Sequence, residues 1–177
     1  YNTTRSNHEA YLYCFQQLDI PIKMEVLDQF HGYSIRQVLE SVTPELDQSQ
    51  YEHLKKLKAQ VYPEYFNHIQ RNDELFDFAN KQKEQGKTIV LISSAQLVNI
   101  HNVLKYFKDF ELFDEIYARD HVKNPKPDPE IYQKCIEDLS LRVDDCIVFE
   151  DSPIGIQSAQ GAGLRTVKVD TYNHERQ

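Results

Sequence analysis

Hydrophobic residues follow one spacing in the first part of the chain and another in the rest, and the change falls near residue 70. Up to that point they recur every three or four positions, the spacing of amphipathic helices. The stripe residues of the four predicted segments are Tyr11, Cys14, Phe15 and Leu18; Met24, Leu27 and Phe30; Ile35, Val38, Leu39 and Val42; and Tyr51, Leu54, Leu57, Lys58 and Val61. Short amphipathic segments bury their stripes by packing together, so residues 1–70 are predicted to form a helical lobe.

Local signals mark where these helices begin and end. Gly32 stops the second segment, and Ser34 is predicted to cap the third, because a serine hydroxyl can accept a hydrogen bond from an unpaired N–H of the first turn. Pro63 ends the fourth segment. No strand is expected in this part of the chain.

From about residue 72 onward, helical stripes alternate with short β-branched runs. Strands are predicted at residues 88–93, 115–118, 145–150 and 165–169, with the first and third buried on both faces. The intervening helices are marked by Leu75, Phe78 and Ala79; by Leu97, Ile100, Val103, Leu104 and Phe107; by Ile131, Cys135, Ile136 and Leu139; and by residues 154–160. Such alternation predicts an α/β fold, a parallel sheet with helices on both faces.

Composition narrows the classes of function. The 177 residues carry 28 acidic against 20 basic side chains, a formal charge of −8, and no run of lysine or arginine. This charge disfavours nucleic acid and anionic lipid as partners. The longest uncharged apolar stretch, residues 88–95, is far too short to span a bilayer. We therefore expect a cytoplasmic protein, a monomer or weak dimer, whose three cysteines are core residues rather than disulfides or zinc ligands.

Candidate chemistry lies at the carboxyl ends of the predicted strands, where parallel sheets bind ligands. Ser93 and Ser94 follow the first strand, directly before the predicted start of a helix. Their hydroxyls and the helix N-terminal N–H groups could together bind an anion. The alternative is that Ser94 only caps the helix.

A second candidate is Lys126, which lies in the proline-rich stretch of residues 124–130, just before a predicted helix. Prolines restrict the backbone there, and a lysine held in this way can bring a positive charge to a phosphoryl group or to a carboxylate. The alternative is an ordinary solvated lysine in a loop.

The third candidate is the acidic pair Glu150 and Asp151 at the end of a predicted strand. Two adjacent carboxylates repel each other unless a cation is shared, and Mg²⁺ prefers oxygen ligands. The alternative is that Asp151 or Ser152 caps the following helix. Taken together, the three candidates offer an anion site, a cation and a metal site. Phosphoryl transfer needs these components, but no residue among them is an obvious nucleophile.

Three stretches resemble the haloacid-dehalogenase-like hydrolase superfamily, close to its β-phosphoglucomutase and sugar-phosphatase branch. They are Ile-Ser-Ser at residues 92–94, Lys-Pro-Asp-Pro-Glu-Ile-Tyr at residues 126–132, and Phe-Glu-Asp-Ser-Pro-Ile-Gly-Ile-Gln-Ser-Ala-Gln-Gly-Ala-Gly at residues 149–163. The resemblance implies a Rossmann-like core over residues 71–177 with residues 1–70 as an inserted α-helical cap.

The same resemblance implies roles for individual residues. Ser93 and Lys126 would be catalytic and would bind the phosphoryl group together with Ser94, while Glu150 and Asp151 would hold Mg²⁺. The implied activity is that of a Mg²⁺-dependent phosphatase, which would act on a small phosphorylated metabolite such as a sugar phosphate through an aspartyl-phosphate intermediate.

One family motif has no counterpart in this sequence. The nucleophile and its acid/base partner belong to an Asp-x-Asp-Gly-Thr motif just before the cap, and the chain opens at Tyr1-Asn-Thr-Thr. We expect a short preceding segment, absent from this sequence, to carry that motif and the central strand of the sheet. Two alternatives stay open: a phosphomutase, or, if the N-terminus is authentic, a non-catalytic phosphate-binding protein.

Overall fold

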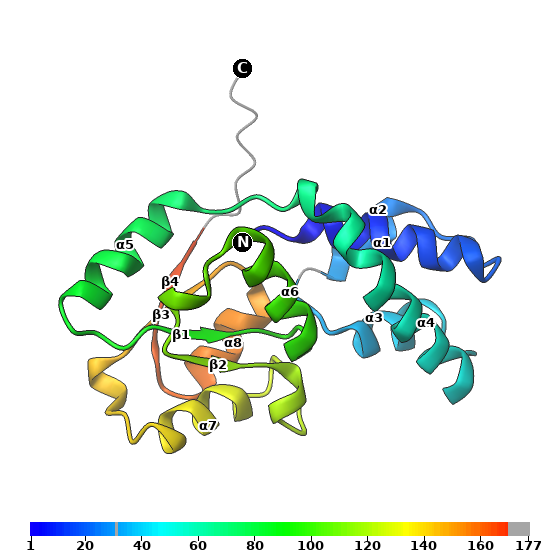
Figure 1. Ribbon diagram of the computed structural model, residues 1–177. Coiled ribbons are helices and arrows are strands. Elements are labelled where there is room, and N and C mark those ends of the chain that lie inside the picture. Colours follow the sequence, from blue (N-terminus) through cyan, green and yellow to red (C-terminus); the bar gives the residue numbers. More distant parts are fainter. Residues whose placement is uncertain (31, 170–177) are drawn as a thin grey trace. The chain divides into compact units, whose positions relative to one another are not determined.

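The computed structural model describes residues 1–30 and 32–169, and its chain divides into two compact units (Figure 1). The first unit is Tyr1–Asn72 and the second is Asp73–Gln177. Helices alone make up the regular structure of the first unit, apart from one isolated bridge, and the second combines helices with parallel strands. The protein therefore has the predicted α/β fold.

The first unit contains the four helical segments that the sequence predicts. Its elements are α1 (Thr4–Gln17), α2 (Met24–Leu27) with the 3₁₀ turn η1 (Asp28–Phe30), α3 (Ile35–Val42), α4 (Gln48–Val61) and the 3₁₀ helix η2 (Tyr62–His68). An antiparallel bridge joins the backbones of Asn2 and Gln70, which donate N–H groups to each other over 2.8 and 3.1 Å. This bridge brings the two ends of the unit together.

The core of the first unit is formed largely by the predicted stripes. Phe15 and Leu54 are fully buried, and Lys58 is only 5% exposed. The Lys58 ammonium donates to Asn7 Oδ1 over 2.8 Å and lies 4.7 and 4.3 Å from the ring centroids of Tyr11 and Tyr62. Burial lowers the pKa of Lys58 from 10.5 to about 8, against an opposing effect of Cys14. Folding removes water from this amine and so disfavours its charged form.

The predicted cap of α3 is confirmed. Ser34 Oγ accepts from Gln37 N over 3.4 Å, and Gln37 Oε1 accepts from Ser34 N over 2.9 Å. This reciprocal pair is a capping box, which satisfies two N–H groups at the helix start.

The second unit alternates helices and strands in the predicted order. Its elements are α5 (Asp73–Glu84), β1 (Val90–Ile92), α6 (Leu97–Phe107), η3 (Phe110–Leu112), β2 (Glu115–Tyr117), η4 (Arg119–His121), α7 (Glu130–Asp138), η5 (Val143–Asp145), β3 (Ile147–Glu150), α8 (Pro153–Gly161) and β4 (Arg165–Lys168). The strands are shorter than predicted, because backbone pairing covers only part of each β-branched run.

The strands of the second unit form two parallel pairs. In the first pair Val90 faces Glu115 and Ile92 faces Tyr117. In the second pair β3 lies beside β4, with Glu150 facing Lys168. Within the described residues no strand bridges the two ladders. The expectation that a preceding segment supplies the central strand stays a prediction. The two pairs nevertheless share one core.

That core lies beneath α7 and α8. Tyr117, Ile131, Tyr132, Cys135, Ala159 and Leu164 are its buried members, and the strand residues Val90, Ile92 and Val148 pack against it. Val148 and its neighbours in β3 thus face opposite sides, because successive side chains of a strand alternate.

The other face of β3 is less covered than predicted. Ile147 is 54% exposed and Phe149 is 39% exposed, so this strand is not buried on both faces. The Phe149 ring packs against Phe78 of α5, with centroids 5.6 Å apart. Phe78 itself is 44% exposed, whereas Phe76, which the stripe analysis omitted, is buried. On α5 the buried aromatic residue is therefore Phe76 rather than Phe78, while the predicted residues Leu75 and Ala79 are partly buried.

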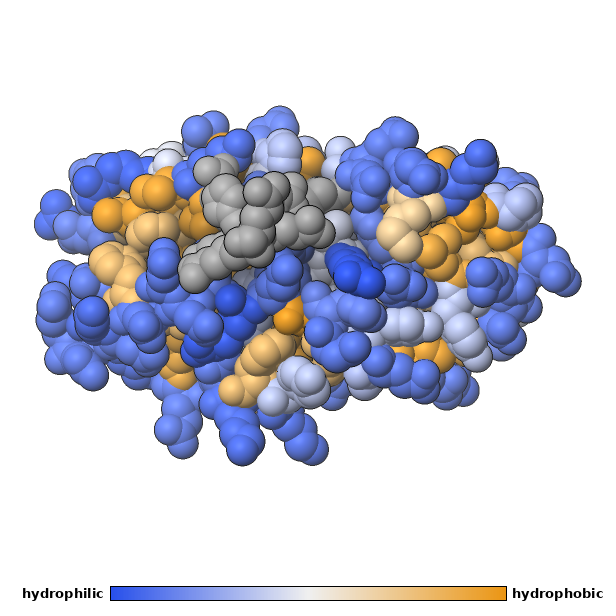
Figure 2. All heavy atoms as spheres, turned by 90° about the horizontal axis from the view of Figure 1, so that it is seen from above, coloured by the Kyte–Doolittle hydropathy of each residue, from blue (hydrophilic) through white to orange (hydrophobic). Residues whose placement is uncertain are grey.

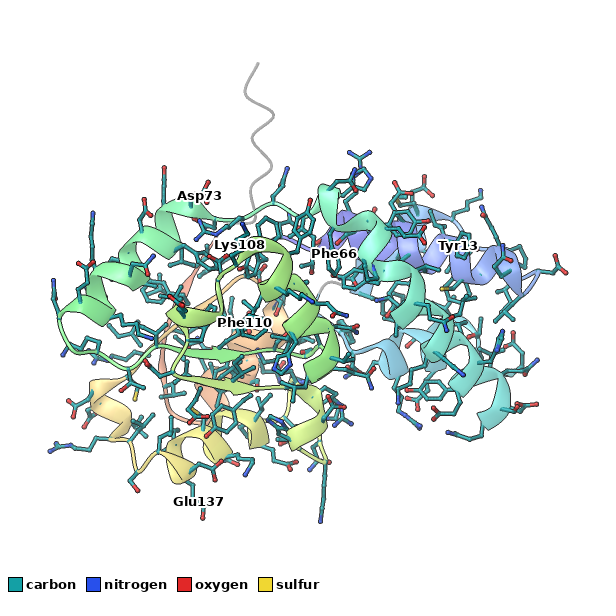
Figure 3. The ribbon with its side chains drawn as sticks, in the orientation of Figure 1. Tyr13, Phe66, Asp73, Lys108, Phe110 and Glu137 are labelled. Carbon is teal, nitrogen blue, oxygen red and sulfur yellow. The ribbon has the colours of Figure 1, made fainter. Side chains whose placement is uncertain are left out.

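Local conformation ends α6 after Phe107. Lys108 takes up a left-handed backbone conformation with φ of 61°, and Phe110 lies in the following turn (Figure 3). The ring centroids of Phe110 and His101 are 5.4 Å apart. The surface drawn in Figure 2 is mainly hydrophilic and interrupted by smaller hydrophobic patches. Among the described residues, none of the helices combines the length and the apolar character that crossing a membrane requires.

Candidate active site at the strand ends

Ser93 lies at the carboxyl end of β1, as the sequence predicts. Its backbone N–H donates to Tyr117 O over 2.9 Å, which extends the β1–β2 ladder by one bond. Its hydroxyl accepts from Ala95 N over 3.1 Å. The loop after β1 is therefore tightly turned, with the Ser93 oxygen held by the backbone of its own loop.

The helix that follows begins later than predicted. We expected it to start directly after Ser94, but α6 begins at Leu97, and its N-cap residue is Gln96. Leu97 N donates to Asp120 Oδ2 over 2.7 Å. The N-terminal N–H of the helix is thus bound by a carboxylate, so the alternative in which Ser94 caps the helix is wrong. Any anion site here depends on the Ser93 loop rather than on that N–H.

Hydrogen bonds tie this loop to the segment after β2. Arg119 N donates to Ala95 O over 2.9 Å, and the Arg119 guanidinium donates to Val122 O and Lys123 O over 2.6 and 3.1 Å. The backbone that leads toward Lys126 is therefore anchored beside the end of β1 and β2.

The carboxylate of Glu130 anchors the same segment from the other side. It accepts from Lys123 N over 2.8 Å and from Asn124 N over 2.7 Å. These two bonds lower the pKa of the Glu130 carboxyl below its usual value. Glu130 is the first residue of α7, so the loop is attached directly to the helix that follows it.

Lys126 is not a solvated loop residue. Only 4% of its surface is exposed, and its ammonium is in direct contact with Glu150 Oε1. It also donates to the Tyr132 hydroxyl over 3.1 Å, and this hydroxyl donates to Glu150 Oε1 over 3.2 Å. Burial, followed by the charge of Glu150, raises the pKa of Tyr132 far above its usual range, so the phenol stays protonated.

The second oxygen of Glu150 binds the start of α8. Glu150 Oε2 accepts from Asp151 N, Ser152 N and Ser152 Oγ over 3.1, 3.2 and 3.1 Å. Ser152 Oγ in turn accepts from Gly155 N over 3.1 Å and makes Ser152 the N-cap of α8. Ser152 rather than Asp151 is therefore the capping residue.

Gly155 makes room for this carboxylate. A Cβ atom placed on Gly155 would overlap the side-chain oxygens of Glu150. The first turn of α8 and the end of β3 thus approach more closely than any other residue type would allow. The glycine belongs to the quoted family stretch, but its spatial role is visible only in the structure.

The acidic pair Glu150 and Asp151 is the part of the site that the sequence predicts to hold Mg²⁺. Both oxygens of Glu150 accept hydrogen bonds, and Asp151 supplies a second carboxylate directly after it in the chain. Among the described residues no cluster of three or more His, Cys, Asp or Glu side chains could hold a metal ion. Mg²⁺ commonly binds one or two protein carboxylates and takes its other ligands from water and substrate phosphate. Two carboxylates are therefore the type and number of protein ligands that such a site uses.

The structure therefore brings Lys126 and Glu150 into contact, and Asp151 directly follows Glu150 in the chain. Ser93 and Ser94 lie in the loop that Arg119 and Asp120 link to the Lys126 segment. Sequence reasoning missed Tyr132 and Gly155. Tyr132 ends the Lys-Pro-Asp-Pro-Glu-Ile-Tyr stretch. The sequence signal for it was its position in the first turn of the helix that follows Lys126.

Comparison with known proteins identifies related sequences. The family model described as haloacid dehalogenase-like hydrolase matches residues 1–169. A fructose-1-phosphate phosphatase, YqaB of Escherichia coli, is 42% identical over 57 residues, which are 32% of this chain and 30% of that protein. The pyrophosphatase PpaX of Bacillus mycoides is 28% identical over 151 residues, 78% of this chain and 70% of that protein. The chain thus spans less than a third of the first of these relatives.

Solved structures share the fold. The crystal structure of a β-phosphoglucomutase from Clostridium difficile superimposes with a TM-score of 0.84 and 23% identity. The match covers 96% of this chain and 79% of that one. At this identity the likeness concerns the arrangement of the chain and not the reaction.

Proposed function

Because the chain belongs to the haloacid dehalogenase-like hydrolase family, we propose that it is a phosphatase that hydrolyses a small phosphorylated metabolite, in particular a sugar phosphate. Water would replace the alcohol of the ester, which yields inorganic phosphate and the free hydroxyl compound. The observation that carries the proposal is the buried ammonium of Lys126, which Glu150 and Tyr132 hold at the end of β3.

Lys126 would bind a non-bridging oxygen of the phosphoryl group. A phosphate ester brings negative charge into the site, and the cost of burying that charge falls when a cation is already in place. Glu150 offsets the Lys126 charge before substrate binds, which makes the buried lysine tolerable in the absence of phosphate.

Asp151, with a contribution from Glu150, would hold Mg²⁺ beside this lysine. The ion would supply further positive charge toward the oxygens of the phosphoryl group. Ser93 and Ser94 would complete the phosphate site through hydroxyl and backbone N–H groups of the loop after β1. We propose no described residue of this site as the nucleophile.

The names of the relatives support phosphate esters and anhydrides as the compounds to test. We would assay fructose 1-phosphate, β-glucose 1-phosphate and pyrophosphate for release of inorganic phosphate, with Mg²⁺ and with a chelator. Release that depends on Mg²⁺ is the expected result. Full activity in the presence of the chelator would contradict the assignment of Asp151 and Glu150 to a metal site.

A matched pair of lysine variants tests the site itself. Lys126→Ala should lower turnover by about two orders of magnitude or more, because it removes charge that stabilises the transition state. Lys134→Ala is the control, since the Lys134 side chain on α7 is 41% exposed and forms an ion pair with Asp138 of the same helix. Equal activity of the two variants would remove Lys126 from the mechanism.

The two alternatives are distinguished by the same compounds. A phosphomutase would convert β-glucose 1-phosphate to an isomer, and a bisphosphate activator would accelerate that conversion. A non-catalytic phosphate-binding protein would bind these compounds in calorimetry without releasing phosphate. Either outcome would replace the phosphatase proposal.

A further inference from the structure

The Tyr132 hydroxyl makes two hydrogen bonds inside the candidate site. Tyr132 lies near the start of α7 and is 2% exposed. Its oxygen accepts from Lys126 Nζ over 3.1 Å and donates to Glu150 Oε1 over 3.2 Å, while Lys126 and Glu150 contact each other directly. The ammonium, the phenol and the carboxylate thus form a closed triangle in which each group contacts the other two.

A phenol is suited to this position because it both donates and accepts. A lysine ammonium offers only donors and an ionised carboxylate only acceptors, so one hydroxyl can serve both at once. The ring adds a steric constraint, since Lys126 Nζ lies 4.9 Å from its centroid. Phenylalanine would fill the same volume, but it would leave the ammonium and the carboxylate each with one partner fewer.

We propose that Tyr132 is a positioning residue for Lys126, and that its hydroxyl fixes the direction in which the ammonium meets a phosphoryl group. The inference rests on the proposed function, in which Lys126 binds that group. A charge held in place before reaction stabilises a transition state without reorganisation. The loss of its support should therefore reduce kcat more than it changes KM.

Tyr132→Phe is the test, and Tyr117→Phe is its matched control. Tyr117 belongs to the same core and is 5% exposed, and its hydroxyl donates to Asp138 Oδ2 over 3.1 Å, outside the triangle. Each variant removes one buried hydroxyl that donates to a carboxylate. We expect Tyr132→Phe to lower kcat about tenfold with KM changed less than about twofold, and Tyr117→Phe to change neither.

A second measurement does not depend on activity. Exchange of the Lys126 ammonium protons with water can be followed by ¹⁵N NMR, with the signal assigned through a Lys126→Arg variant. Hydrogen bonds protect these protons, so Tyr132→Phe should accelerate their exchange several-fold. Tyr117→Phe should leave the exchange rate unchanged.

Each outcome has a distinct meaning. If kcat falls equally in both tyrosine variants, Tyr132 is only a packing residue and the inference is overturned. If neither kcat nor ammonium exchange changes in Tyr132→Phe, the hydroxyl does not position Lys126. If the unmodified protein releases phosphate from no compound, the proposed phosphatase function fails, and ammonium exchange alone decides whether the hydroxyl holds Lys126.

Discussion

Replacement of Gly155 by alanine tests the packing on which the whole site depends. An alanine Cβ at this position would overlap the Glu150 carboxylate, and neither neighbour can yield easily. Gly155 lies in the first turn of α8, and Glu150 Oε2 is held by Asp151 N and by Ser152. The carboxylate must therefore move away from α8 and give up some of its hydrogen bonds.

The size of the effect follows from what the movement breaks. Overpacking by one methyl group costs about 1–3 kcal/mol. Leaving the buried Lys126 ammonium without its carboxylate costs about 3–5 kcal/mol if the separation is complete. Alanine is favoured over glycine within a helix by about 1 kcal/mol, which offsets part of this loss. For a partial displacement we expect a net loss of about 3 kcal/mol in the free energy of unfolding.

Urea denaturation, with circular dichroism as the probe, measures this difference. For a chain of this size, a loss of about 3 kcal/mol corresponds to a fall in Tm of about 6–12 °C. Gly161→Ala is the matched control, because it makes the same substitution in the same helix. A Cβ atom at Gly161 would lie 3.4 Å from Pro129 Cβ, which is van der Waals contact.

The two variants must therefore behave differently. Gly161→Ala should leave stability within about 1 kcal/mol of the unmodified protein. If Gly155→Ala is as stable as Gly161→Ala, Glu150 does not lie against the first turn of α8. The contact between Glu150 and Lys126 would then also be in doubt, together with the site built on it.

Two further predictions concern the helical unit. Burial lowers the pKa of Lys58 to about 8, so above that pH the folded chain releases a proton that the unfolded chain still holds. The free energy of unfolding should therefore rise by about 1 kcal/mol between pH of about 8 and about 9. Urea denaturation at these pH values should show that Lys58→Met abolishes this rise, whereas Lys55→Met in the same helix preserves it; a rise that survives in Lys58→Met would contradict the assignment. Ser34→Ala should cost about 1 kcal/mol through loss of the α3 cap, measured by thermal denaturation. Ser41→Ala in the same helix is its control, and equal losses would refute the role of the cap.

The patterns that the sequence predicted well are local ones. The Ser34 cap depends on atoms within three residues, and the buried residues Ile100, Val103 and Leu104 follow from helical spacing alone. The alternation of strands and helices in residues 73–169 is likewise visible in the order of β-branched runs and stripes. Such features need no knowledge of distant contacts, because backbone hydrogen bonds and side-chain periodicity act over a few positions.

The predictions that failed required distant partners. The start of α6 at Leu97 depends on Asp120, which is 23 residues away along the chain. The choice of Phe76 rather than Phe78 for burial depends on what packs against α5, and helical spacing alone does not distinguish the two.

For the candidate site, the sequence by itself determined which residue types stand at the strand ends: serines, one lysine and two acids. Only the tertiary structure decided that Lys126 is buried against Glu150, that Tyr132 bridges them, and that Gly155 admits the carboxylate. The physical reason is that burial and hydrogen bonding of charged groups depend on neighbours 18 and 24 residues apart in the chain. Residue identity supplies the chemical groups, and the packing of α7 and α8 against the strands sets their contacts.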